Sequence, residues 1–205
     1  GTIPATVLVR ATYPEVRLQV FNDSGLGLGV PGDTDFVEKI LDEQGVRALV
    51  PSTCEECWGD GHITRLVHWI LERDPALEMA VFSSREDSII AGVFLDIEAD
   101  RFEEAMLAET GALNARFPER YRRFIVPGWE HTALLGDPIG IVGEDFGAVE
   151  FSWDAVSALS KLRLGGLEST AIDGFTVGQW LRAFIEDGEA WTDRVAPPGE
   201  SRVSP

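Results

Sequence analysis

The order of apolar and polar residues changes its period along the chain, and these changes predict strands that alternate with helices. Residues 16–21 alternate apolar and polar side chains, as in a strand with one covered face. Residues 62–73 instead carry apolar side chains at helical spacing. Further strands are expected over residues 78–83 and in the apolar run before Pro127-Gly128, and further helices over residues 2–12, 33–44, 101–116 and 176–187.

This alternation predicts an α/β fold in which helices cover both faces of a parallel sheet. Residues 1–195 show one such pattern without an internal repeat, which indicates a single domain. Glycines between residues 25 and 32 predict a mobile loop, after which Thr34 is a candidate N-cap for the next helix. The stretch 196–205 is rich in Pro, Gly and Ser and is expected to be a disordered tail.

The composition and net charge of the chain limit the kinds of molecule that it is expected to bind. The 205 residues include 44% apolar and 25% charged side chains, as in ordinary globular proteins, and no apolar run reaches the length of about 18 residues that predicts a membrane span. The formal net charge of −18 disfavours nucleic acid and anionic membrane surfaces as partners. A polyanionic substrate would need a local basic cluster, for which the candidates are Arg116, Arg120, Arg122 and Arg123.

The predicted strands end in residues that can carry acid–base chemistry. Asp23 and Ser24 follow the first strand, Asp87 follows the second, and His131 follows the third. Functional groups of open parallel sheets collect outside the carboxyl ends of the strands. An acid after one strand and a histidine after the next is the order found for the Asp and His of a hydrolase triad, where the carboxylate orients the imidazole and the imidazole acts as base. We therefore expect Asp87 and His131 to form a catalytic pair.

These strand ends resemble those of the pectin acetylesterase and Notum group of α/β-hydrolase-fold carboxylesterases. In that group a Gly-x-Ser-Ala-Gly type elbow runs into a helix, and Gly1-Thr2-Ile3-Pro4 resembles the residues after such an elbow. Asp23-Ser24-Gly25 matches the strand end that follows. The triad acid resembles Asp87 in Ser83-Ser84-Arg85-Glu86-Asp87, and the triad base resembles His131 in Trp129-Glu130-His131-Thr132. The resemblance covers about residues 1–190.

The resemblance implies a carboxylic ester hydrolase that deacylates an acylated substrate, such as a polysaccharide, without a metal or organic cofactor. It implies an α/β-hydrolase-like sheet whose N-terminal strands, nucleophilic serine and oxyanion loop lie upstream of Gly1. We therefore expect the chain to be the C-terminal part of a secreted or periplasmic enzyme, inactive by itself. Residues 24–61 are expected to cover the pocket as a glycine-hinged lid.

Several of these residues have alternative roles. Glu86 could face His131 in place of Asp87, and Asp87 could instead cap the segment Ser88-Ile89-Ile90. His131 could be a loop residue bonded to a backbone carbonyl. Ser24 does not lie in a Gly-x-Ser-x-Gly elbow, so a turn-forming serine beside the substrate is favoured over an internal nucleophile.

Cys54 and Cys57 form a Cys-x-x-Cys for which a local disulfide is favoured. A thioredoxin-like redox pair is an alternative, although the required βαβ context is missing. A zinc site with His62 as the third ligand is another, although no second cysteine pair is present. His68, six residues after His62, is on a different helix face and is expected to pack beside Trp69.

The remaining tryptophans are expected in the core or in pocket walls. Trp129 lies two residues before His131 and is a candidate substrate-binding residue, whereas Trp153 and Trp180 are candidates for the core or a pocket wall. Two other functions stay open beside the esterase. One is a non-catalytic α/β module that binds a small molecule or glycan, and the other is a thiol redox protein.

Overall fold

The protein is an α/β protein built on a four-stranded parallel sheet, as seen in a computed structural model that describes residues 2–134 and 166–197. Within those residues the strands follow the order β1-β2-β3-β6, and every neighbouring pair is parallel. Their bounds are β1 Leu18–Asp23, β2 Leu77–Ser84, β3 Tyr121–Val126 and β6 Arg194–Val195. A separate antiparallel ribbon joins β4 (Ala171–Ile172) to β5 (Phe175–Thr176).

Helices connect the strands and follow the expected periodicity. The α-helices are α1 Thr2–Thr12, α2 Thr34–Glu43, α3 Thr64–Arg73, α4 Ala99–Arg116 and α7 Val177–Ile185. Short 3-10 turns lie at η1 Arg47–Leu49 and η2 Gly59–Gly61, and a π-helical segment, η3, spans Ile89–Leu95. No described helix is both long and apolar enough to cross a bilayer.

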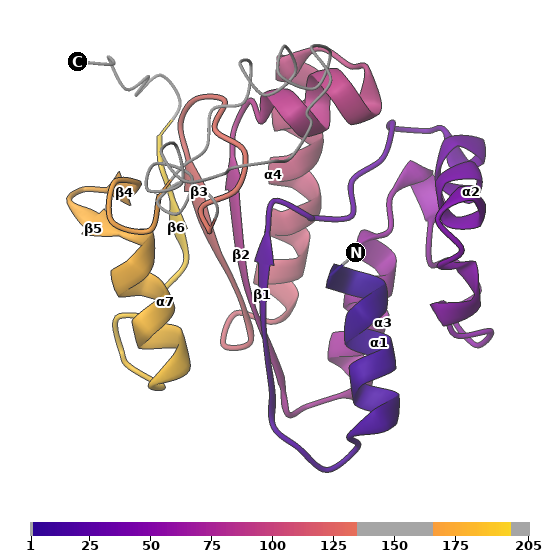
Figure 1. Cartoon of the computed structure of the whole chain (residues 1–205), viewed down its shortest axis with the longest axis horizontal. Coiled ribbons are helices and arrows are strands. Elements are labelled where there is room, and N and C mark those ends of the chain that lie inside the picture. The colour runs from indigo at the N-terminus through magenta and orange to yellow at the C-terminus, as the bar shows by residue number, and fades with distance from the viewer. Residues whose placement is uncertain (1, 135–165, 198–205) are drawn as a thin grey trace, which may run out of the picture.

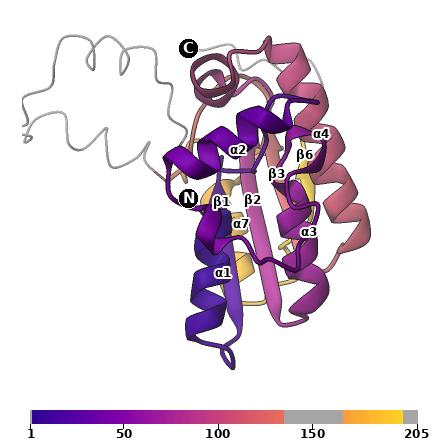
Figure 2. The same ribbon diagram turned by 90° about the vertical axis from the view of Figure 1, so that its right-hand side faces the viewer.

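Helices lie on both faces of the sheet, as predicted (Figures 1 and 2). On one face, Met79 and Val81 of β2 pack with residues of α1, α3 and α4. On the other face, Phe82 of β2 packs with Trp180 of α7 in a second buried cluster. Because neighbouring residues of a strand point to opposite faces, the continuous apolar run of β2 supplies both cores at once.

The structure confirms most of the expected elements and corrects their details. The helix over residues 2–12 and the strand over 78–83 are present, the latter extended by one residue at each end. The predicted N-cap Thr34 is wrong, because Asp33 occupies that position and its carboxylate accepts a hydrogen bond from the N–H of Phe36 at 2.9 Å. The segment η3 and the short strands β4, β5 and β6 were not predicted.

The predicted tail begins with residues that are in fact packed. The N–H of Ala196 donates to the carbonyl of Ile125 at 2.9 Å, and Ala196 is fully buried. The disordered tail expected from residue 196 is therefore wrong at Ala196, since the chain still follows the edge of the sheet there. Residues 198–205 lie outside the described residues.

Candidate functional site

The carboxyl ends of three parallel strands meet at one edge of the sheet, and the loops that follow them are joined by hydrogen bonds. The N–H of Arg85 donates to the carbonyl of Val126 at 2.9 Å, and the N–H of Glu86 donates to the carbonyl of Gly128 at 2.9 Å. The N–H of Ser24 donates to the carbonyl of Phe82 at 2.9 Å. The backbone pairing of the sheet thus continues beyond the strand ends and holds the loops side by side.

This pairing brings Asp87 and His131 together. Nδ1 of His131 lies 3.0 Å from each carboxylate oxygen of Asp87. Asp87 has no exposed surface, whereas 18% of the His131 side chain is exposed. A carboxylate on Nδ1 favours the tautomer that keeps its proton there, which leaves Nε2 able to accept a proton. The geometry is that of an oriented general base.

Asp87 also holds the backbone that follows it. Its Oδ1 accepts hydrogen bonds from the N–H groups of Ile89 and Ile90 at 3.2 and 3.0 Å. The two roles considered for Asp87 are therefore compatible, since one carboxylate caps the start of the next segment and contacts the imidazole. It is Asp87 and not the neighbouring Glu86 whose carboxylate contacts His131.

The end of β1 binds the backbone on the other side of His131. Asp23 accepts hydrogen bonds from the N–H groups of Ala133 and Leu134 at 2.8 and 3.0 Å. Ser24 is buried, and its hydroxyl accepts a hydrogen bond from the N–H of Thr132 at 3.2 Å. Burial raises the pKa of Asp23, and the hydrogen bonds from the N–H groups of Leu134 and Ala133 oppose that shift.

A buried arginine ties the same loops to more distant elements. Arg85 precedes Asp87 by two residues and pairs with Glu103 of α4. Its guanidinium also donates to the carbonyl of Ala196, with Nε at 3.1 Å. Since a buried guanidinium needs acceptors for its N–H groups, α4 and the chain after β6 both help to fix the Asp87 loop.

An apolar cavity of about 260 Å³ lies at this edge of the sheet, beside Ser24. Ile3 and Pro4 at the start of α1 form one part of its wall, and Ile90 and Phe94 form another. Most of the rest comes from the segment 24–61, through Leu26, Leu28, Ile40, Leu41, Gln44 and Val46, and Ile63 and Leu95 complete the wall. The segment that was expected to act as a lid therefore does line a pocket, and its opening stays a prediction.

That segment is anchored by close backbone contacts. His62 is buried, and its Nδ1 accepts a hydrogen bond from the N–H of Gly29 at 3.1 Å. Burial lowers the pKa of His62, which suits this acceptor role. Gly29 lies so close to the carbonyl of Gly61 that a Cβ there would be only 2.1 Å away. His62 thus has a structural partner in the loop.

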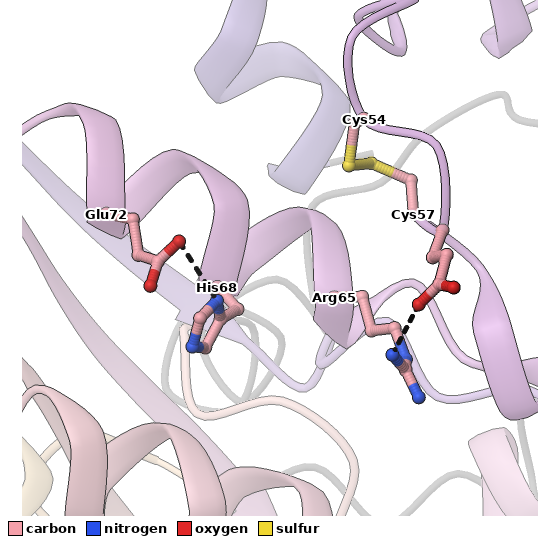
Figure 3. Close-up of a disulfide and its surroundings, with 6 residues drawn as sticks. Cys54, Cys57, Arg65, His68 and Glu72 are labelled. Carbon is pink, nitrogen blue, oxygen red and sulfur yellow. Dashed lines mark hydrogen bonds and ion pairs between the residues drawn. A yellow bond between two sulfur atoms is a disulfide. The ribbon is translucent and has the colours of Figure 1, made fainter.

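The disulfide expected between Cys54 and Cys57 is present, with 5.4 Å between the Cα atoms. It lies beside the start of α3, from which Arg65 and His68 project (Figure 3). Both sulfur atoms are bonded to each other and are therefore not thiolate ligands for a metal in this structure. His68 is half-buried and meets the edge of Phe117, with 5.2 Å between ring centroids.

The tryptophans singled out in the sequence differ in burial. Trp180 is fully buried between α7 and the sheet, as predicted. Trp129 is 45% exposed next to the histidine loop. Its carbonyl accepts a hydrogen bond from the N–H of Ser88 at 3.3 Å. Trp153 lies outside the described residues.

The arginine cluster does not form a common basic patch. Arg123 pairs with Asp193, and Arg122 pairs with Glu119. Arg120 donates to backbone carbonyls at the end of α3, and Arg116 lies 3.4 Å from Glu72. Because these guanidinium groups already have partners, they do not supply the local positive field that a polyanion would need.

Sequence reasoning identified Asp87 and His131 but missed the roles of Asp23 and Arg85. The position of Asp23 at a strand end gave a signal, yet its partners are backbone N–H groups, which no side-chain pattern reveals.

Comparison of the chain with protein-family models, with curated proteins and with solved structures gave no match.

Proposed function

We propose that this chain carries the acid and base of a serine-type carboxylic ester hydrolase. The observation that carries the proposal is the contact of a fully buried Asp87 carboxylate with Nδ1 of His131 at the carboxyl edge of a parallel sheet. Acid and base follow neighbouring strands in the chain order of α/β-hydrolases. On this proposal the sheet is α/β-hydrolase-like, with further strands beyond β1, which pairs only with β2 in the described part of the chain.

The chemistry follows from the imidazole. A serine hydroxyl attacks the ester carbonyl while Nε2 of His131 takes its proton, and the buried carboxylate of Asp87 stabilises the resulting imidazolium. His131 then returns the proton to the leaving alkoxide, and a water molecule repeats the sequence on the acyl-enzyme. None of these steps needs a metal or an organic cofactor.

The start of α1 supports a nucleophile just before Gly1, as the family resemblance implies. Thr2 lies beside Gly25, so the beginning of α1 is at the same sheet edge as the end of β1. Ile3 and Pro4 line the apolar cavity there. A residue before α1 would meet this cavity and the N-terminal N–H groups of the helix, which favour a developing negative charge.

The cavity supports an ester with an apolar acyl group. Its wall is made mostly of aliphatic side chains, which favour burial of methylene groups over charged ones. The exposed ring of Trp129, two residues before His131, offers a surface for the alcohol part, which the family resemblance suggests is a polysaccharide. The Cys54–Cys57 disulfide is in keeping with a secreted or periplasmic protein.

The test is to produce the protein with the residues that precede Gly1 in its coding sequence and to assay hydrolysis of short-chain aryl esters. We expect turnover by the natural enzyme and a loss of roughly 10³-fold or more in kcat for His131→Ala. His68→Ala is the matched control, because His68 lies on α3 and packs against Phe117 just after α4. This variant should keep normal turnover. Equal rates for the His131→Ala and natural enzymes would contradict the proposal.

A non-catalytic module that binds a small molecule or glycan is the second candidate, and the apolar cavity is the observation in its favour. Such a module has no need for a buried carboxylate on an imidazole. Binding of an ester without turnover, in the protein that contains the upstream residues, would favour it.

A further inference from the structure

Three consecutive backbone N–H groups after His131 all donate to the end of β1. Those of Ala133 and Leu134 donate to the two carboxylate oxygens of Asp23, and that of Thr132 donates to Ser24 Oγ. Asp23 and Ala133 are 110 positions apart in the sequence, so these bonds exist only in the folded sheet. They fix the chain on the C-terminal side of His131.

The backbone on the N-terminal side of His131 is held separately. The hydroxyl of Ser84 donates to the carbonyl of Glu130, and both the N–H and the hydroxyl of Ser88 donate to the carbonyl of Trp129. Hydrogen bonds therefore hold the backbone on both sides of His131. Only the set after His131 depends on a carboxylate.

The conformation just after His131 needs this support. Thr132 has φ +58°, in the left-handed region that a β-branched residue rarely adopts. Such a conformation persists where surrounding interactions hold it. The bonds from Thr132, Ala133 and Leu134 to Asp23 and Ser24 are the interactions that hold it here.

We propose that Asp23 is a positioning residue for His131, whose carboxylate holds the backbone of residues 132–134 so that the imidazole stays on Asp87. This inference rests on the proposed esterase function, because the placement of His131 affects a rate only if His131 transfers protons. Asp23 acts through the loop and makes no contact with the substrate.

The charge of Asp23 is part of this role. An ionised carboxylate makes stronger hydrogen bonds to N–H groups than a neutral one. Burial has the largest effect on the pKa of Asp23 and raises it, whereas the hydrogen bonds from Leu134 and Ala133 lower it. Of the charged groups that act on Asp23, His131 lowers this pKa and Asp87 raises it. Protonation of Asp23 should weaken the bonds to Ala133 and Leu134 and release the loop.

The experiment compares Asp23→Asn and Asp23→Ala with Asp193→Asn in the protein that includes its upstream residues. Asp193 is a matched control because its carboxylate also accepts a backbone N–H from another segment, that of Arg123 at 2.8 Å, away from the histidine loop. We expect kcat to fall about tenfold for Asp23→Asn and about a hundredfold for Asp23→Ala, with little change in KM, since a displacement of about 1 Å can cost that much. Asp193→Asn should keep the natural kcat.

Two further measurements separate positioning from a general structural role. Amide hydrogen exchange at Ala133 and Leu134 should become faster in Asp23→Asn and stay unchanged in Asp193→Asn. In the natural enzyme the acid limb of log kcat should steepen at low pH, from uptake of about one proton to uptake of about two, because Asp23 takes up a proton in addition to the general base. The Asp23→Asn enzyme should keep the single-proton limb throughout.

The outcomes distinguish this inference from the proposed function. If the natural enzyme hydrolyses esters and Asp23→Asn matches it in kcat and in amide exchange, the positioning role is overturned while the esterase stands. If the natural enzyme shows no hydrolysis, the proposed function fails. The exchange rates at Ala133 and Leu134 then still decide whether Asp23 holds the loop.

Discussion

Both carboxylate oxygens of Asp87 lie 3.0 Å from Nδ1 of His131. The contact joins two loops whose backbones are themselves hydrogen-bonded, through Glu86 N–H to the Gly128 carbonyl. The pair is therefore formed by the sheet itself and does not require a substrate to assemble it.

Replacing Asp87 by Asn should remove the orientation of the imidazole while keeping the shape of the side chain. An amide can donate to Nδ1 and so favour the tautomer with its proton on Nε2, which cannot act as base. We expect kcat for aryl esters to fall by roughly 10³- to 10⁴-fold. Glu86→Gln is the control, since the Glu86 carboxylate does not contact His131, and it should keep normal turnover. A tenfold loss or less for Asp87→Asn would argue against a triad.

The apolar cavity predicts a preference among acyl chains. Each methylene that enters it should gain about 0.8 kcal/mol, or about fourfold in kcat/KM. We expect kcat/KM for aryl esters to rise from acetyl to butyryl to hexanoyl, until the cavity of about 260 Å³ is filled.

A larger side chain in the cavity wall should reduce that preference. Ile40→Trp should lower kcat/KM for hexanoyl esters more than for acetyl esters, because Ile40 lines the cavity. Leu8→Trp is the control, since Leu8 is exposed on α1 and is not part of the cavity wall. Equal losses for both chain lengths in Ile40→Trp would place the acyl group elsewhere.

The disulfide should contribute to stability and not to catalysis. Cys54 and Cys57 are both buried in the core that α1, α3 and α4 share with the sheet. Closing so short a loop should add about 2 kcal/mol to the free energy of unfolding. Urea unfolding of Cys54→Ser should show that loss, while ester hydrolysis at 25 °C stays unchanged. A folded Cys54→Ser protein that has lost turnover would instead point to thiol chemistry.

The pKa of Asp23 predicts how stability depends on pH. Burial raises this pKa above the ordinary value of 3.8, so the folded protein binds the proton more tightly than the unfolded chain. The contribution of Asp23 to the free energy of unfolding should therefore decrease as the pH rises from below 3.8 through the pKa of Asp23 in the folded protein. Asp23→Asn removes this effect and should gain stability relative to the natural protein over the same range. Urea unfolding at several pH values measures the difference, and a gain that shrinks with rising pH would contradict the sign.

The sequence was sufficient to predict the order of helices and strands, because the periodicity of each element is set by residues that are close together in the chain. The alternation before Asp23 and the continuous apolar run of β2 both correspond to strands, although β1 begins and ends two residues later than expected. Asp33 was missed as the cap of α2 because Asp33 and Thr34 are both good capping residues, and only the backbone of the preceding loop decides between them.

Elements formed by long-range pairing could not be predicted in this way. The strand β6 has two residues, too few to show a period, and exists because Arg194 and Val195 pair with β3.

The segment η3 was missed for a different reason. It is apolar throughout, so its sequence does not distinguish a strand from a helix.

The contact between Asp87 and His131 was predictable from the sequence, whereas the hydrogen bonds that support it were not. Parallel strands place their carboxyl ends at the same edge, which was enough to bring Asp87 and His131 together. The hydrogen bonds from the backbone after His131 to Asp23 depend on where that loop lies and on the conformation of Thr132. Only the three-dimensional structure shows both.

The bond from Arg85 to the carbonyl of Ala196 joins residues 111 positions apart, and this has a consequence for synthesis of the chain. During translation the first strands emerge and begin to fold while Ala196 is still missing. Until Ala196 arrives, the guanidinium of Arg85 lacks one of its acceptors, and the adjoining loop lacks one of its fixed points. Asp87 should therefore settle beside His131 only late in translation, after β1, β2 and β3 have already paired.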